Sequence, residues 1–147
     1  MIRAISAAET RPLRQAVLRP HQRVEELVYP GDDDPRTHHL GAFDGGRLVG
    51  IASIYVEPMV AMPDAGPTDW RLRGMATAPE MRGTGLGGAL LEACIEHSRN
   101  HGGTRLWCNA RVPAAGFYLR YGFVVHGEEF DLPGIGPHYL MSRRIGA

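Results

Sequence analysis

A glycine-rich segment at residues 82–88 has the composition of an anion-binding turn. It reads Arg-Gly-Thr-Gly-Leu-Gly-Gly and leads directly into a stretch with helical periodicity. Such a turn places several unpaired backbone N–H groups at the positive end of a helix dipole, where phosphate is the commonest ligand. Glycine suits these positions because a side chain would hold the phosphate away from the amides, and because some of them are expected to have positive φ. The segment therefore predicts a phosphate-binding site.

Three phosphate compounds compete for this turn. A nucleoside triphosphate is disfavoured because a P-loop ends in Gly-Lys-Ser/Thr, and the segment contains no lysine. Gly83, Gly85 and Gly88 match the dinucleotide motif G-x-G-x-x-G, but the next predicted strand lacks the acidic residue that this motif requires. The third compound is coenzyme A, whose pyrophosphate fits an R-x-x-G-x-G pattern formed by Arg82, Gly85 and Gly87. A purely structural turn is disfavoured, because each glycine at a helix start costs about 1 kcal/mol unless something uses it.

Two segments resemble signatures of the GCN5-related N-acetyltransferase (GNAT) superfamily. Residues 75–88 are similar to its motif A, and residues 114–123, a helix with Phe-Tyr that closes on Gly-Phe, are similar to its second signature. Further similarity, to the ElaA-like branch of this superfamily, lies in residues 13–22, 32–34, 39–40, 106–111 and 134–138. The resemblance implies that residues 1–147 form a single acetyltransferase domain, which uses acetyl-CoA as a co-substrate and acetylates a primary amine.

The resemblance also implies roles for individual residues. Backbone N–H groups of Met75 or Ala76 are expected to hold the oxyanion. Tyr118 matches the family's general acid, which protonates the leaving thiolate, and a pKa of about 10 keeps a phenol protonated at neutral pH. The alternative role for Tyr118 is that of a core tyrosine. The residues expected to bind acetyl-CoA are Met75, Ala76, Thr77, Arg82, Gly83, Thr84, Gly85, Leu86, Gly87, Gly88, Asn109 and Phe117.

The acceptor side carries weaker signals. His39 and His138 are candidates for acceptor binding or for the catalytic base, because histidine titrates near neutrality, and the alternative for each is a structural role. Glu128 is a further candidate, since a glutamate that faces the cleft would suit a cationic amine. A water relay could also serve as the base. Arg111 stands where many members of the superfamily have an asparagine, and it could instead contact a phosphate. No metal is expected.

The resemblance implies direct attack of the amine in a ternary complex. A covalent route through Cys108 is disfavoured, because nothing in the sequence activates this thiol. The alternative function, from another class, is a non-catalytic acyl-CoA-binding sensor or scaffold module. It would bind coenzyme A without needing Tyr118.

Composition limits the partners. The formal net charge is zero, with 16 basic and 16 acidic residues, so there is no electrostatic case for nucleic acid or for a membrane surface. No stretch approaches the roughly 20 apolar residues of a membrane span, and we expect a cytoplasmic protein. A small-molecule acceptor is favoured over a protein, because no extended acidic groove for a basic peptide is evident. A homodimer is an open alternative.

Periodicity and turn residues predict the elements that position these groups. We expect strands at residues 1–6, 39–43, 48–56, 70–77, 104–110, 123–130 and 138–144, and helices at 6–20, 86–101 and 113–121. Residues 58–68 form a loop, which could be a lid or an acceptor-side loop. The expected fold class is α+β, an α/β three-layer arrangement. The GNAT resemblance implies a mixed central sheet of six to seven strands with helices on both faces, and a splay between the two central parallel strands.

Overall fold

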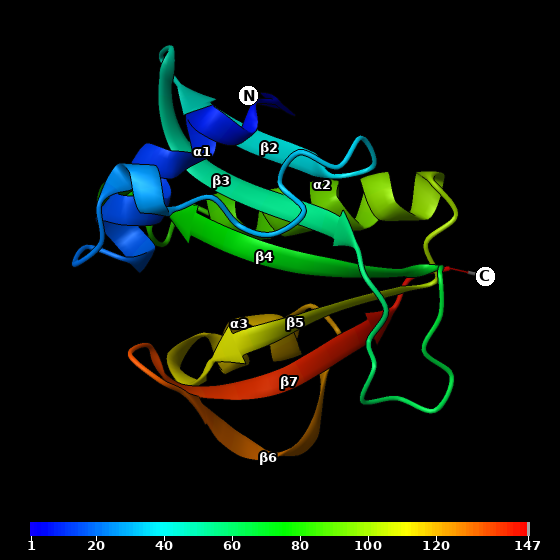
Figure 1. The fold of residues 1–147 in the computed structure, drawn as a ribbon. Coiled ribbons are helices and arrows are strands. Elements are labelled where there is room, and N and C mark those ends of the chain that lie inside the picture. Colours follow the sequence, from blue (N-terminus) through cyan, green and yellow to red (C-terminus); the bar gives the residue numbers. More distant parts are fainter. Residues whose placement is uncertain (147) are drawn as a thin grey trace.

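A mixed seven-stranded sheet organises the protein, as seen in a computed structural model that describes residues 1–146 (Figure 1). The strand order is β1-β2-β3-β4-β5-β7-β6. The strands are β1 (Ile2–Ala4), β2 (His38–Asp44), β3 (Arg47–Val56), β4 (Asp69–Thr77), β5 (Arg105–Arg111), β6 (Val124–Leu132) and β7 (Gly136–Arg144). Every strand predicted from the sequence is present, in the predicted order along the chain.

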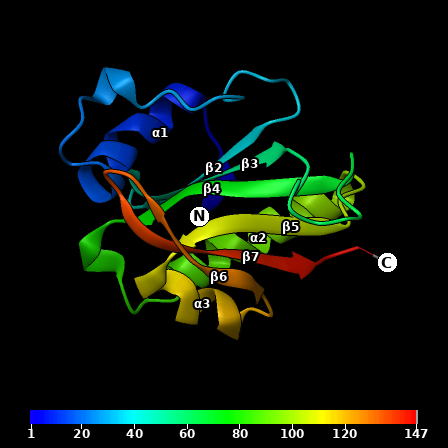
Figure 2. The ribbon, with the colours of Figure 1, turned by 60° about the horizontal axis from the view of Figure 1, so that its bottom comes forward.

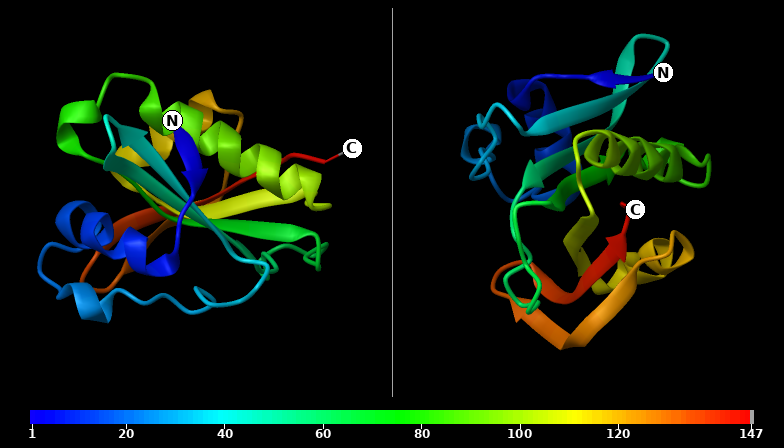
Figure 3. Two further views of the ribbon diagram at one scale, coloured as in Figure 1. Left: turned by 90° about the horizontal axis from the view of Figure 1, so that it is seen from above. Right: turned by 90° about the vertical axis from the view of Figure 1, so that its right-hand side faces the viewer.

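Helices cover both faces of the sheet, as Figures 2 and 3 show. Helix α1 packs on one face, and α2 and α3 pack on the other. The helices are α1 (Ala7–Leu13), α2 (Leu86–Asn100) and α3 (Ala115–Arg120), with the shorter segments η1 (Arg14–Leu18), η2 (Val24–Glu26), η3 (Pro79–Met81) and η4 (Val112–Ala114). The three-layer arrangement expected from the sequence is confirmed. Within residues 1–146, no helix is both long and apolar enough to cross a membrane.

The N-terminal helical segment follows its sequence signals. Ser6 caps α1 through a capping box, in which its hydroxyl accepts from the Glu9 backbone and the Glu9 carboxylate accepts from the Ser6 backbone. Pro12, which has no N–H to donate, lies just before the α-helix gives way to the π-helical turn η1. The predicted helix is therefore present, but its second half is wound more loosely than an α-helix.

Strands β4 and β5 are parallel and separate along their length. They pair only near their beginnings, where Asp69, Trp70 and Arg71 lie opposite residues 105–107. Beyond this point β4 carries a bulge at Gly74, which has a φ of 65°, while β4 continues to pair with β3 on its other side. The carboxyl ends of β4 and β5 therefore diverge, and the splay expected from the sequence is confirmed.

The main core lies between the sheet and α2. Leu90, Leu91, Cys94 and Ile95 of α2 are fully buried against apolar residues of the strands. These positions recur at helical spacing and therefore lie on one face of α2. Because its inner face is fixed by this packing, α2 holds its N-terminus at the carboxyl end of β4, where the glycine-rich turn is needed.

Three histidines stack beside Trp70, where α2 ends. The ring centroids of His38 and His97 are 3.7 Å apart, and those of His97 and His101 are 4.1 Å apart. Burial, followed by repulsion from the other two imidazoles, lowers the pKa of His97 to about 4. In the unfolded chain His97 therefore takes up a proton near pH 6.5, whereas in the folded chain it does so only near pH 4.

We expect the free energy of unfolding to fall as the pH drops from about 6.5 to about 4, because protons favour the unfolded chain in this window. Thermal melts followed by circular dichroism across this range will measure the effect. His97→Gln should flatten the decline, since it removes the group whose pKa is lowered. If the melting temperature of the variant falls with pH as steeply as that of the wild type, His97 is not the source of the pH dependence.

Candidate active site

A cavity of about 400 Å³ lies at the N-terminus of α2, between the carboxyl end of β4 and α3. Its walls are formed by the glycine-rich turn, the end of β4 and one face of α3. Its lining residues are Met75, Ala76, Thr77, Met81, Arg82, Gly83, Gly85, Leu86, Gly87, Gly88, Ala114, Phe117, Tyr118, Arg120 and Tyr121. Ten of the twelve residues predicted to bind acetyl-CoA line this cavity, and the exceptions are Thr84 and Asn109.

The glycines of the turn leave open space above their amides. Gly83 and Gly85 have φ angles of 79° and 85°, and a Cβ built on either one would meet no atom within 4 Å. A Cβ on Gly87 would contact only the Phe117 ring, at 3.5 Å. Gly88 differs, because a Cβ there would lie 1.8 Å from the Tyr121 hydroxyl. The first three glycines therefore keep the turn accessible to an anion, whereas Gly88 allows the Tyr121 side chain to pack closely against the start of α2.

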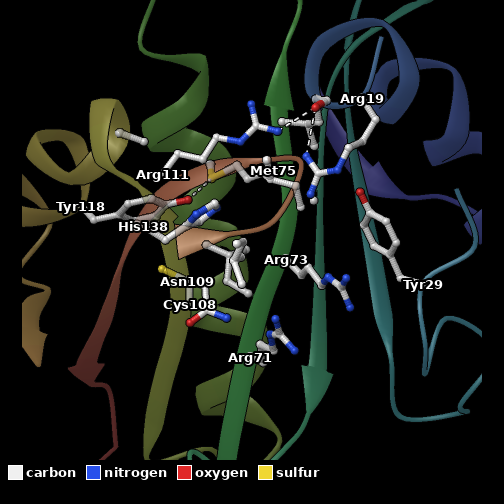
Figure 4. Close-up of a pocket in the computed structure, with 17 residues that line it drawn as sticks. Arg19, Tyr29, Arg71, Arg73, Met75, Cys108, Asn109, Arg111, Tyr118 and His138 are labelled. Carbon is white, nitrogen blue, oxygen red and sulfur yellow. Dashed lines mark hydrogen bonds between the residues drawn. The ribbon is translucent and has the colours of Figure 1, made fainter. Parts of the chain in front are cut away.

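A second cavity, of about 210 Å³, lies between the diverging strands β4 and β5 and extends toward β7 (Figure 4). It shares Met75, Ala114 and Tyr118 with the first cavity, so the two meet at these side chains. Residues 58–68 line neither cavity. The interpretation of that loop as a lid or an acceptor-side loop was therefore wrong. It is tied to the opposite end of β4, where the Met59 and Gly66 backbones donate to the Asp69 carboxylate.

Tyr118 stands where the two cavities meet. It projects from α3 and packs between Phe117 and Phe123. Its hydroxyl lies 3.6 Å from the Met75 sulfur, a weak hydrogen-bond acceptor (Figure 4). Burial raises the pKa of Tyr118 well above its ordinary value, so the phenol stays protonated at neutral pH. The group is thus a proton donor whose one hydrogen-bond partner within residues 1–146 is a thioether sulfur.

His138 is buried and lines the second cavity. Its Nδ1 lies 2.7 Å from the Gly136 carbonyl oxygen. Because a carbonyl can only accept, Nδ1 must carry the proton, and in the neutral ring Nε2 then bears the lone pair. Nε2 has no hydrogen-bond partner within residues 1–146. The structure thus gives His138 a fixed tautomer with a free basic nitrogen.

His39 and Glu128 do not reach either cavity. The His39 ring is buried on the α1 face of the sheet, with Nδ1 2.6 Å from the Ser53 hydroxyl and Nε2 3.0 Å from the Asp32 carbonyl. Asp32 also forms a buried ion pair with Arg14, at 2.7 Å. Glu128 is exposed in an irregular part of β6, between His126 and Phe130. The structure therefore gives His39 a structural environment and keeps Glu128 away from the cleft.

Cys108 and Asn109 are adjacent on β5 and both line the second cavity. Burial raises the pKa of Cys108 to about 12, so the nucleophilic thiolate is scarce at neutral pH. Asn109, one of the residues expected to bind acetyl-CoA, lines the second cavity and not the first. Thr84 is not among the residues that line the first cavity, and its hydroxyl donates to the Met81 carbonyl.

Sequence reasoning missed the basic lining of the second cavity. Arg19, Arg71, Arg73 and Arg111 come from three separate segments of the chain. The one signal in the sequence is the spacing of Arg71 and Arg73, because alternate residues of a strand share a face. The approach of Arg19 to Arg111 depends on how the segment after α1 packs over β5, which no local pattern reveals.

Comparisons with known proteins agree with this arrangement. A model of the acetyltransferase (GNAT) family matches residues 3–123. The chain is 35% identical over 144 residues to the uncharacterized N-acetyltransferase YitI of Bacillus subtilis (strain 168), covering 98% of this chain and 95% of that protein.

Solved structures share the fold. ElaA of Escherichia coli superimposes with a TM-score of 0.77 at 19% identity, covering 98% of this chain and 99% of that one. An aminoglycoside 6'-N-acetyltransferase complexed with coenzyme A gives 0.76 at 14% identity, covering 99% and 97%. The family model covers most of the chain, and the Bacillus relative covers nearly all of it. The chain therefore belongs to the acetyltransferase (GNAT) family of N-acetyltransferase enzymes.

Proposed function

We propose that the protein transfers the acetyl group of acetyl-CoA to a primary amine by direct attack in a ternary complex. The observation that carries this proposal is that two cavities meet at the side chains of Met75, Ala114 and Tyr118. One cavity has the open glycine-rich turn of an anion site, and the other is large enough for a small acceptor. Such a junction lets a thioester approach from one side and an amine from the other.

Acetyl-CoA fits the first cavity. Its pyrophosphate would accept hydrogen bonds from the amides of residues 83–87 at the N-terminus of α2, where the helix dipole favours negative charge. Its pantetheine arm would lie along residues 75–77 of β4, on the edge that β5 leaves unpaired. The structural neighbour solved with coenzyme A has the same overall fold, which supports this placement.

The reaction requires three proton and charge adjustments. The amine nitrogen attacks the thioester carbon, and the oxyanion that forms would be held by the N–H of Met75 or Ala76. The carbon–sulfur bond then breaks, and Tyr118 gives its proton to the leaving thiolate. The attacking nitrogen loses one proton in turn, so that the products are an amide and the free thiol of coenzyme A.

We assign the removal of the amine proton to His138. Its Nε2 carries the lone pair in the tautomer that the Gly136 carbonyl fixes, and it faces the cavity that adjoins Tyr118. Histidine is the residue that most often serves as a general base in enzymes. The proton would then return from solvent to Tyr118 after the thiol has left.

Initial-velocity kinetics test the direct mechanism. With acetyl-CoA and the amine varied together, double-reciprocal lines should intersect, because both substrates bind before either product leaves. Cys108→Ala should retain activity within about threefold, since burial keeps this thiol protonated and it would not carry the acetyl group. Parallel lines, together with loss of turnover in Cys108→Ala, would instead establish an acetyl-cysteine intermediate.

A further inference from the structure

Positive charge dominates the second cavity, where the acceptor would bind. Arg19, Arg71, Arg73 and Arg111 line it, and its lining residues include no aspartate or glutamate (Figure 4). The whole chain has a formal net charge of zero, so this concentration is local. Arginine does not lose its proton in proteins, and burial cannot neutralise these groups.

Arg19 and Arg111 converge on one backbone atom. The guanidinium of Arg19 donates to the Leu18 carbonyl at 2.9 Å, and that of Arg111 donates to the same oxygen at 2.6 Å (Figure 4). Neither forms a salt bridge within residues 1–146. Each guanidinium has five N–H donors, so most of their donors remain available. Two like charges held this close favour the binding of an anion between or beside them.

Arg71 and Arg73 extend the positive surface along β4. The Arg71 guanidinium pairs with the half-exposed Glu57 carboxylate at 3.1 Å, while its buried Nε has no partner within the described residues. Arg73 has no carboxylate partner there, and its guanidinium stacks on the Tyr29 ring at 4.2 Å from the centroid. Burial, followed by repulsion from Arg71, lowers the pKa of Arg73. Within residues 1–146, Arg71 is thus the only one of the four arginines with a carboxylate partner.

We propose that the acceptor amine carries an anionic group, a carboxylate or a phosphate, that binds this arginine cluster, defined here as Arg19, Arg71, Arg73 and Arg111. The proposal rests on the function proposed above and names its acceptor class. Guanidinium groups match carboxylate and phosphate oxygens in geometry as well as in charge. The same cations would disfavour a protonated amine nearby and so help to deliver the neutral nucleophile.

The arginine cluster argues against a polycationic acceptor. Several structures of this fold are aminoglycoside 6'-N-acetyltransferases by name, and an aminoglycoside carries several ammonium groups. Here such a ligand would meet four guanidinium groups and no carboxylate in the cavity lining. The sequence also suggested that Glu128 would attract a cationic amine. Glu128 does not line this cavity, so it cannot supply the negative charge that such an amine would need.

Matched pairs of amines test the proposal. The phosphate arm compares glucosamine 6-phosphate with glucosamine, and O-phosphoethanolamine with ethanolamine. The carboxylate arm compares L-alanine and L-glutamate with ethylamine, and spermidine serves as a polycation. Thiol release from acetyl-CoA should give a kcat/KM at least about tenfold higher for the anionic member of a pair, since one hydrogen bond to a charged group supplies that much. The set of pairs with the larger increase in kcat/KM shows whether the site prefers a phosphate or a carboxylate.

Variants of the cluster provide the second readout. Arg73→Met and Arg111→Met keep the side chain's apolar length and should raise KM for the anionic amine by roughly 10- to 100-fold, with kcat less affected. Arg73→Lys should restore part of the affinity. Arg23→Met is the matched control, because Arg23 is exposed and lines neither cavity. Melting curves verify that each variant is folded.

The outcomes separate this proposal from the proposed function. Thiol release that is equally fast with charged and uncharged partners, or unchanged in Arg73→Met and Arg111→Met, overturns the anionic acceptor and leaves the acetyltransferase activity intact. Faster release from succinyl-CoA than from acetyl-CoA with uncharged amines would place the anion on the acyl group, and this also overturns the proposal.

Absence of thiol release with every amine would count against the proposed function. Calorimetry on protein saturated with coenzyme A then decides the inference independently of turnover. Binding of the anionic member of a pair without its uncharged partner supports the proposal, and binding of neither overturns it.

Discussion

Tyr118→Phe lowers kcat by roughly 100- to 1,000-fold and leaves the dissociation constant for coenzyme A within about threefold, because a general acid contributes in this range and acts only on the leaving group. The phenol is buried at the junction of the cavities, and its raised pKa keeps the proton available for the thiolate. Phenylalanine keeps the ring and its contacts with Phe117 and Phe123, so the fold should persist. Steady-state kinetics and calorimetry measure the two quantities.

Tyr139→Phe is the control for this substitution. Tyr139 lies on β7 and lines neither cavity, so loss of its hydroxyl should leave kcat within about twofold of the wild type, if Tyr118 alone is the acid. Equal turnover of Tyr118→Phe and wild type would remove this residue from the chemistry. His138→Gln should complement the result: activity falls at neutral pH and recovers at higher pH, where the amine loses its proton without assistance.

The second large effect is expected at the glycine-rich turn. Gly87→Val should weaken binding of coenzyme A by roughly 100-fold or more, because branched methyl groups would occupy the space in which the pyrophosphate meets the amides. Gly87 is the best position for this test, because a side chain there causes neither backbone strain nor a collision. Gly85 has a φ of 85°, so any side chain there is strained, and a side chain on Gly88 would collide with Tyr121. At Gly87 a Cβ makes only an ordinary contact with Phe117.

Gly116→Val is the matched control. Gly116 is an exposed position of α3 that lines neither cavity, and a Cβ there meets no atom within 4 Å. Both variants introduce the same side chain into a helix, so their melting temperatures report the cost to the fold, and calorimetry reports the cost to binding. Normal affinity in Gly87→Val would refute the assignment of the pyrophosphate to this turn.

Local patterns allowed most of the fold to be predicted. The hairpin between β2 and β3 follows from Asp44-Gly45-Gly46 between two alternating strands, and both glycines have positive φ in the structure. The buried face of α2 follows from residues at helical spacing, and the turn before it from its glycines. The π-helical end of the first helix was not predicted, because Pro12 signals a disturbance of the ladder without specifying its form.

The two sides of the site differed in how well the sequence predicts them. The first cavity is formed by two short segments, residues 75–88 and 114–121, and the first of them carries a strong glycine signal. The second cavity brings together Arg19, which follows the first helical segment, and Arg111, which ends β5, and both donate to the Leu18 carbonyl. The same long-range packing buries His39 with Asp32 and Ser53, although its sequence context suggested an acceptor-side role. Such contacts depend on tertiary packing, and spacing along the chain does not encode them.

The measurement that tests the central claim most directly is thiol release from acetyl-CoA in the presence of a panel of anionic, uncharged and polycationic amines, with the acetylated product identified by mass spectrometry. The proposed mechanism predicts stoichiometric thiol and N-acetylated amine, formed only when both substrates are present and strongly reduced in Tyr118→Phe. Tight binding of coenzyme A without amine-dependent thiol release, in wild type and variant alike, would contradict it.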